Sequence, residues 1–226
     1  MKNVEDKTVL NYLGCVTPLL NVQMELADEA MNIKNFNILK NMPVEINDQF
    51  IPDSDWKVQV FNCYEKQDYS IFHGSYAFSV VAGKSKEIVY KVFKELITME
   101  DEQFLNIIHP AALVSRSVQL NHGLQLEPLS IIAACTSLGF GVHIKRNSSV
   151  GHHCVIDDYV TINPGVTLSS FVQVGKYTEI GTGTAVKDNI TIGANSLIGA
   201  GSVVVKDIPP NSIAYGNPCR VHRAKD

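Results

Sequence analysis

The chain carries an aliphatic residue at every sixth position over almost half of its length. The series has no gap, and each of its members is Ile, Leu or Val. An α-helix requires a spacing near 3.6 and a half-buried strand a spacing of 2. A strict period of six indicates short strands separated by corners, as in a parallel β-helix built of hexapeptide repeats. The positions are Ile108, Val114, Leu120, Leu126, Ile132, Leu138, Ile144, Val150, Ile156, Ile162, Leu168, Val174, Ile180, Val186, Ile192, Ile198 and Val204.

A second set of inward positions lies two residues before members of this series and carries smaller side chains. Three hexapeptides make a triangular coil of 18 residues, and successive coils stack at the strand spacing of about 4.8 Å. The sequence therefore predicts a β-helix with a continuous core. The smaller inward residues are Thr136, Val142, Ser148, Cys154, Val160, Val166, Val172, Thr178, Thr184, Ile190, Ser196 and Ser202.

Composition narrows the class of protein. A length of 226 residues suggests one or two domains, and the net charge of −4 offers no basic surface for nucleic acid. The longest apolar stretches, such as residues 131–135, are too short to span a bilayer, and residues 1–7 lack the apolar core of a signal peptide. Five cysteines without a CxxC pair fit a reduced, cytoplasmic protein.

The residues before Ile108 alternate between strand-like and helix-like patterns. This alternation indicates a small, mostly parallel α/β sheet, with Pro18 placed to start the first helix. We expect strands at residues 8–13, 35–39, 57–63 and 78–81, and helices at residues 19–32 and 85–96. The domains predicted are a Rossmann-like α/β domain (1–105), a β-helix (106–215) and a C-terminal tail (216–226).

The run Gly151-His152-His153-Cys154 is the sharpest departure from the repeat. Adjacent histidines at a corner point in different directions, and surface histidines are common, so solvated imidazoles are one interpretation. A zinc site is another, but His122, His143, His152 and His153 lie 21, 9 and 1 residues apart, without the converging pair that a zinc site needs. Cys154 occupies an inward position, where a thiol is inert.

From Asn106 onward the chain resembles the sugar O- and N-acyltransferases of the sialic-acid O-acetyltransferase type, which include the bacillosamine- and perosamine-pathway N-acetyltransferases. The N-terminal part resembles this family in architecture only. The segments that carry the resemblance are NIIHPAALVS (106–115), SSVGHHCVIDDY (148–159), INPGV (162–166), IGAGSVVVKDIP (198–209) and GNP (216–218).

The resemblance implies a left-handed coil, a homotrimer, acyl-CoA bound between subunits, no metal, and a nucleotide-linked amino sugar bound by the N-terminal domain. It also implies that His152 is the catalytic base. An imidazole with a pKa near 6.5 suits this task, because it can accept a proton at neutral pH. His153 stands where the family has an acidic residue beside the base, and Thr161 stands where it often has a second histidine, which His143 could replace.

The resemblance also assigns two groups of ligand-binding positions. The positions near acyl-CoA are Thr161, Thr182, Ala200, Gly201, Gly216, Asn217 and Pro218. The positions near the sugar nucleotide are Cys15, Val16, Thr17, Pro18, Lys40, Asn41 and Gly83. The turn at 14–18 and the pair at 40–41 replace a Gly-rich turn and an acidic pair of the family.

These observations favour an acyl-CoA-dependent N-acyltransferase, in its simplest form an N-acetyltransferase, that acts on a nucleotide-linked amino sugar by direct transfer. A sugar or sialic acid O-acetyltransferase is the alternative in the same family. A metal hydratase of the γ-carbonic anhydrase type and an inactive scaffold are further alternatives, and a metal assay would separate the first of them from the acyltransferases.

Overall fold

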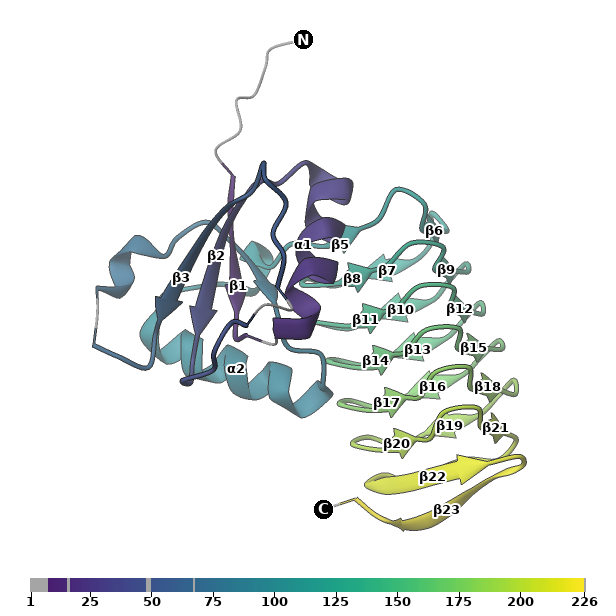
Figure 1. Ribbon diagram of the computed structural model, residues 1–226. Helices are drawn as coiled ribbons and strands as arrows, with labels where there is room; N and C mark the ends of the chain where they lie inside the picture. The colour runs from purple at the N-terminus through teal and green to yellow at the C-terminus, as the bar shows by residue number, and fades with distance from the viewer. Residues whose placement is uncertain (1–7, 16, 48–49, 67, 226) are drawn as a thin grey trace.

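The chain folds into an α/β domain that packs against a long parallel β-helix (Figure 1). The computed structural model describes residues 8–15, 17–47, 50–66 and 68–225. In the α/β domain, four parallel strands lie in the order β3-β2-β1-β4. The strands are β1 (Val9–Leu13), β2 (Asn35–Lys40), β3 (Lys57–Asn62) and β4 (Ser75–Phe78). The helices are α1 (Thr17–Met31), α2 (Gly83–Leu96) and the 3₁₀ turns η1 (Tyr69–Ile71) and η2 (Asp101–Gln103).

The predicted strand at residues 78–81 is wrong in its position. The strand that pairs with β1 is Ser75–Phe78, so only Phe78 is common to both. The apolar residues that follow pack elsewhere. Val80 lies in van der Waals reach of Gly14, and the carbonyl of Val81 accepts a hydrogen bond from Thr161 of the β-helix. An apolar segment that packs against a second domain can have the same composition as a β-strand and yet pair with no other strand.

The hexapeptide prediction is confirmed by the strand register. From β5 to β21, every strand residue paired within the coils lies 18 positions from its partner, as His143 does from Thr161, so one coil is three hexapeptides. The coil is a left-handed parallel β-helix, whose faces we call the first, second and third sheets.

The first sheet contains β5 (Ile107–Ile108), β8 (Gln125–Leu126), β11 (His143–Ile144), β14 (Thr161–Ile162), β17 (Glu179–Ile180) and β20 (Leu197–Ile198). The second contains β6 (Leu113–Val114), β9 (Ile131–Ile132), β12 (Ser149–Val150), β15 (Thr167–Leu168), β18 (Ala185–Val186) and β21 (Val203–Val204). The third contains β7 (Gln119–Leu120), β10 (Ser137–Leu138), β13 (Val155–Ile156), β16 (Gln173–Val174) and β19 (Thr191–Ile192).

Both inward sets of the repeat form the core of the β-helix. The smaller set is buried from Thr136 through Ser202, and the aliphatic set is buried from Leu126 onward. The first coil differs. Ile108 and Val114 are half-buried, and Leu120 is 39% exposed, because no coil covers the open end of the stack. Burial of apolar surface along the stack is the main source of its stability.

The α/β domain covers the first sheet of the β-helix. Phe78 and Phe104 stack with centroids 5.0 Å apart, and both meet Phe140 of the β-helix edge to face. At the other edge of the same sheet, Glu29 of α1 contacts His109, with Oε2 and Nε2 2.8 Å apart. The second sheet lies on the far side of the β-helix (Figure 1). The outward side chains of the first four strands of this sheet, from Ile107 to Thr161, are therefore buried, whereas Glu179 and Leu197 further along are half-buried.

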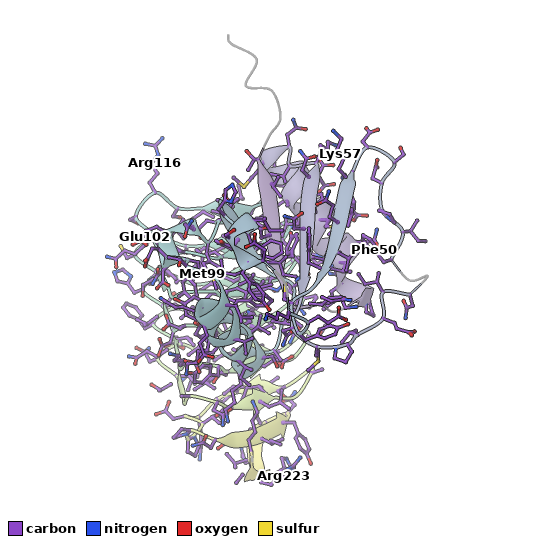
Figure 2. All side chains as sticks on the ribbon, turned by 90° about the vertical axis from the view of Figure 1, so that its left-hand side faces the viewer. Phe50, Lys57, Met99, Glu102, Arg116 and Arg223 are labelled. Atoms are coloured by element: carbon purple, nitrogen blue, oxygen red, sulfur yellow. The ribbon has the colours of Figure 1, made fainter. Side chains whose placement is uncertain are left out.

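The C-terminal segment closes the β-helix. β22 (Ser212–Gly216) continues the first sheet beside β20, and β23 (Cys219–Ala224) pairs with β22 in antiparallel fashion. The expected tail is thus a strand, which covers the last coil and its otherwise unpaired edge. Figure 2 shows Arg223 of β23 and Arg116 of the first coil at opposite ends of the molecule.

Candidate active site

His152 and His153 lie at the corner that joins β12 of the second sheet to β13 of the third. His153 adopts a left-handed backbone conformation, with φ of 57°, which turns its ring away from the coil. Both rings are exposed, and their Nδ1 atoms lie 3.0 Å apart. The ring of His153 stacks on Phe171 of the next coil at 5.0 Å, and His152 meets the same ring edge to face. The aromatic contact holds the pair in a defined arrangement.

The contact between the two Nδ1 atoms limits the protonation of the pair. Only one of these atoms can donate, so the other must supply a lone pair. When His152 donates, its Nε2 is left without a proton and is available as a base. The adjacent Cys154 is buried; its thiol contacts the carbonyl of Ser169 at 3.2 Å, and burial raises its pKa. A nucleophilic role for this thiol is thus disfavoured, in agreement with its inward position in the repeat.

Most of the predicted acyl-CoA positions form one column at a different corner, between the first and second sheets. Thr182 and Ala200 are exposed and lie 18 residues apart, one above the other. The pairing of β20 with β22 continues this column to Gly216, which precedes the cis Asn217–Pro218 bond. The small residues, with Gly201 beside Ala200, leave the backbone accessible to a ligand.

Thr161 does not belong to this exposed column. Its side chain is fully buried beneath the α/β domain, where the hydroxyl donates to the carbonyl of Val81 and accepts from Lys86 Nζ at 3.2 Å. A contact between this side chain and acyl-CoA would require the domain to move away. His143 lies beside Thr161 in the ladder, one coil earlier, as expected from the spacing.

The predicted sugar-nucleotide positions fall into two places. Cys15 follows β1, and Lys40 with Asn41 marks the end of β2, so they share the carboxyl edge of the sheet, where open α/β sheets bind ligands. Pro18 lies beside them in the first turn of α1. Val16 lies outside the described residues, as does the side chain of Thr17.

Gly83 has a packing function in this structure. A Cβ atom there would lie 2.6 Å from the carbonyl oxygen of Tyr177 and 2.7 Å from its Cα. The residue thus lets the start of α2 approach the backbone of the β-helix closely. That Gly83 also borders the sugar-nucleotide site stays a prediction.

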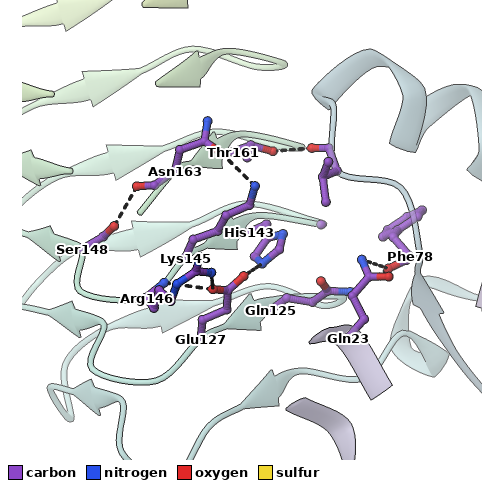
Figure 3. Close-up of polar contacts among 12 residues, drawn as sticks. Gln23, Phe78, Gln125, Glu127, His143, Lys145, Arg146, Ser148, Thr161 and Asn163 are labelled. Carbon is purple, nitrogen blue, oxygen red and sulfur yellow. Dashed lines mark hydrogen bonds and ion pairs between the residues drawn. The ribbon is translucent and has the colours of Figure 1, made fainter. Parts of the chain in front are cut away.

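A cavity of about 180 Å³ lies between α1 and the first sheet, at the first–second corner. Sequence analysis named His143 on its wall but missed Glu127, Lys145 and Arg146 beside it (Figure 3). Glu127 Oε1 lies 2.9 Å from His143 Nε2, and Glu127 Oε2 accepts hydrogen bonds from the backbone and guanidinium of Arg146. Lys145 Nζ donates to Asn163 Oδ1 at 2.8 Å in the next coil. In an ordinary coil, these outward positions carry solvated side chains. A group of acidic, basic and imidazole side chains at such positions was the sequence signal that could have revealed the cluster.

Electrostatics fix the charges of this cluster. Burial, together with the nearby Lys86, lowers the pKa of His143 to about 4, so its imidazole is neutral near pH 7. Burial alone would raise the pKa of Glu127, but its hydrogen bonds with His143 and Arg146 hold it at about 2. The result is an ionised carboxylate that orients a neutral imidazole.

The histidines of the repeat do not converge. His122 lies at the third–first corner, His143 on the first sheet, and His152 with His153 at the second–third corner. Among the described residues, no three His, Cys, Asp or Glu side chains gather closely enough to share a metal ion. In the same part of the chain, no helix has the length and apolar character to cross a membrane.

Comparisons with known proteins agree with this architecture. Residues 171–206 match the family model of the bacterial transferase hexapeptide, six repeats. This part of the chain thus matches a hexapeptide-repeat model in sequence. Over 104 residues it is 30% identical to the GDP-perosamine N-acetyltransferase of Escherichia coli O157:H7. The matched stretch makes up 46% of this chain and 44% of that relative, so it spans less than half of either protein.

Solved structures extend the likeness to both domains. A mutant perosamine N-acetyltransferase from Caulobacter crescentus, in complex with CoA and GDP-perosamine, superposes with a TM-score of 0.77 at 20% identity; the match covers 96% of this chain and 97% of that one. The acetyltransferase domain of PglB from Neisseria gonorrhoeae, in complex with acetyl coenzyme A, superposes with a TM-score of 0.76 at 22% identity. The match covers 96% of this chain and 100% of that one. At these identities the likeness establishes the shared fold.

Proposed function

We propose that this protein is an acyl-CoA-dependent N-acyltransferase that transfers an acetyl group to the amine of a nucleotide-linked sugar. The likeness to the perosamine enzyme carries the proposal, because it covers the α/β domain as well as the β-helix. A hexapeptide coil alone serves many acyltransferases, whereas the added domain supplies a sheet edge for a nucleotide. Five cysteines without a CxxC pair fit the reducing cytoplasm as the compartment.

The histidine pair supplies the base for direct transfer. The amine nitrogen attacks the thioester carbonyl, a C–N bond forms, and the C–S bond breaks with release of the CoA thiol. His152 Nε2 accepts the proton that the amine loses and passes it to the departing CoA thiolate, while its Nδ1–H is held by the lone pair of His153 Nδ1. No covalent acyl-enzyme is needed, since both substrates occupy the site together.

A single protomer does not bring the base and the acyl-CoA column together. His152 lies at the second–third corner, whereas Thr182 and Ala200 lie at the first–second corner. We therefore place the active site between copies, with His152 of one copy facing the acyl-CoA column of another. The exposed Leu113 and Ile131 on the second sheet provide apolar surface for such a contact. A closed homotrimer satisfies this arrangement with one type of interface.

The test is an acceptor panel. Purified protein is incubated with acetyl-CoA and UDP-, dTDP- or GDP-linked amino sugars, each paired with its hydroxyl counterpart. Release of the CoA thiol and the mass of the product are measured. We expect acetyl transfer to one class of amino sugar and none to the matched hydroxyl sugar. Thiol release without an acetylated product, or no turnover with any acceptor, would contradict the proposal.

A further inference from the structure

Phe171 is a large apolar side chain at a solvent-facing corner of the β-helix, where it is 47% exposed. It occupies the same corner position as His153 one coil earlier, since the two residues adopt left-handed backbone conformations with φ of 60° and 57°. At this position the other coils carry small or polar residues, namely Ser117, Cys135 and Asn189. A single exposed apolar residue is common on protein surfaces, so the contacts of the ring decide whether it has a role.

Phe171 contacts both histidines of the corner. Its ring stacks on that of His153, with centroids 5.0 Å apart and an angle of 20° between the planes. The same ring meets His152 at 5.2 Å and 87°. The backbone amide of Phe171 donates to the carbonyl of His152 at 3.0 Å, which ties the two coils together at this point. One side chain thus limits the freedom of two imidazole rings.

The hydrogen bond between the histidines depends on the orientation of the His153 ring. His153 Nδ1 is one atom on one edge of that ring, whereas either oxygen of a carboxylate can accept. The torsion that turns a histidine ring is broad, so an unrestrained ring directs Nδ1 away from His152 in many orientations. Stacking restricts His153 to a plane in which the two Nδ1 atoms lie 3.0 Å apart. Of the two ring orientations in that plane, the hydrogen bond itself selects the one with Nδ1 toward His152.

Water competes for this hydrogen bond. Both histidines are exposed, and a surface hydrogen bond between neutral groups contributes little because water can replace either partner. Phe171 covers one face of the His153 ring and brings no polar side-chain atom that could bind either imidazole. The ring therefore keeps a defined orientation although it is not buried.

We propose that Phe171 is a positioning residue that acts through His153. By fixing the plane of the His153 ring, it keeps His153 Nδ1 on the Nδ1–H of His152 and so leaves His152 Nε2 without a proton, ready to act as the base. The kinetic consequence rests on the proposed function, whereas the orientation of the ring does not. The acidic residue that the resembled family carries at this position has two equivalent acceptor atoms, so the aromatic ring is needed only with a histidine.

A double-mutant cycle tests the dependence of Phe171 on His153. The kcat and KM of acetyl transfer are measured for Phe171→Leu, which removes the ring, and for Phe171→Tyr, which keeps it. We expect Phe171→Leu to lower kcat by about two- to tenfold, the value of one aromatic contact, without a change in KM, and Phe171→Tyr to match the wild type. In the His153→Ala background, Phe171→Leu should have no further effect, because the residue through which it acts is gone.

Asn189→Ala is the matched control. Asn189 occupies the same corner position one coil beyond Phe171, with φ of 59°, and its side-chain amide donates to Asp188. Its kcat should equal that of the wild type. A loss of kcat in Phe171→Leu that is the same with and without His153, or a change in KM alone, would overturn the inference.

A second measurement does not depend on activity. In the intact protein labelled with ¹⁵N-histidine, two-bond ¹H–¹⁵N correlation spectra at mildly alkaline pH show which ring nitrogens carry protons; His152→Ala and His153→Ala provide the assignments. We expect protons on His152 Nδ1 and His153 Nε2 in the wild type, and mixed tautomers of His153 in Phe171→Leu. Identical spectra of the two proteins would overturn the inference. Tautomers that depend on Phe171 in a protein without acetyl transfer would refute the proposed function and retain the positioning contact.

Discussion

The chemistry of the site depends on one contact between two side chains, His152 and His153. A carboxylate beside a catalytic histidine accepts its Nδ1–H and also stabilises the imidazolium that forms. The Nδ1 lone pair of His153 can perform the first of these tasks, since the two atoms lie 3.0 Å apart. It brings no negative charge for the second. In the proposed mechanism, His153 therefore orients the base.

Substitution of the pair separates these roles. We expect His152→Ala to lower kcat by about 10²–10⁴, the usual cost of losing a general base, without loss of folding. His153→Ala should cost less, and His153→Glu should retain or raise kcat because it restores both acceptor and charge. Rates are compared under saturating acetyl-CoA, with circular dichroism as the check on folding.

His73→Ala is the control for these variants, because His73 is exposed in the α/β domain, away from the corner. A loss of activity in His153→Ala together with a near-normal His152→Ala would reverse the assignment. Full activity in both would mean that the pair is a solvated corner, as surface histidines often are.

Sequence analysis named His143 but not the side chains around it. Glu127 meets His143 because their coils stack, and Gln23 lies near them only because α1 docks onto the first sheet. The hexapeptide rule specifies which side chains point inward and says nothing about what covers the outside of a face. By contrast, the position of His152 follows from the repeat together with the family motif, and both are local in sequence.

At the scale of elements, α2 is attached to the β-helix by a buried lysine. Lys86 Nζ donates to the carbonyl of Gly141 at 2.9 Å and to Thr161 Oγ1 at 3.2 Å, both uncharged acceptors. Burial, with a smaller contribution from Lys145, lowers the pKa of Lys86 to about 7. The helix contact therefore includes an ammonium group that loses its proton far more readily in the folded protein than in the unfolded chain.

This arrangement predicts a pH dependence of stability. Between about pH 7 and 10.5 the unfolded chain keeps the lysine proton that the folded protein releases, so the free energy of unfolding rises with pH. Relative to Lys86→Met, the wild type should gain up to about 1.4 kcal/mol per pH unit in this window. Chemical denaturation of both proteins across the range, at one protein concentration, measures the difference.

Lys91→Met provides the control, because Lys91 lies on the same helix with its side chain 67% exposed. Parallel stability curves for the wild type and Lys86→Met would contradict the burial of an ionisable ammonium at this contact.

The elements themselves were predictable to different degrees. The β-helix could be predicted from its repeat, because the fixed spacing of the repeat also gives the register between one coil and the next. The sheet of the α/β domain could be predicted from alternating patterns. The observed strand, however, ends at Phe78, where the expected strand at 78–81 begins, since apolar residues of this segment pack on the β-helix. The segment expected as a tail forms β23, which pairs with β22 and covers the last coil. Nothing in the composition of this segment shows that the end of the β-helix must be covered.

For the whole molecule, the decisive geometry is the triangular section of the β-helix. The α/β domain occupies the first sheet, and the histidine corner lies opposite that sheet, where the second and third sheets meet. The proposed base and the proposed acyl-CoA column are thus on separate corners, and one chain alone cannot join them. Association through the remaining faces can bring the corner of one copy to the column of the next.

A mixing experiment tests this composite site. His152→Ala and Ala200→Trp should each be nearly inactive, the first without a base and the second with a blocked acyl-CoA column, since Ala200 is exposed on that column. When the two variants are co-expressed with different tags and isolated as mixed trimers, each of these trimers should have one restored site among its three. A restored site takes its column from a His152→Ala copy and its base from an Ala200→Trp copy. Each variant mixed with itself is the control, and a mixed oligomer without recovered activity would place the base and the column in the same chain.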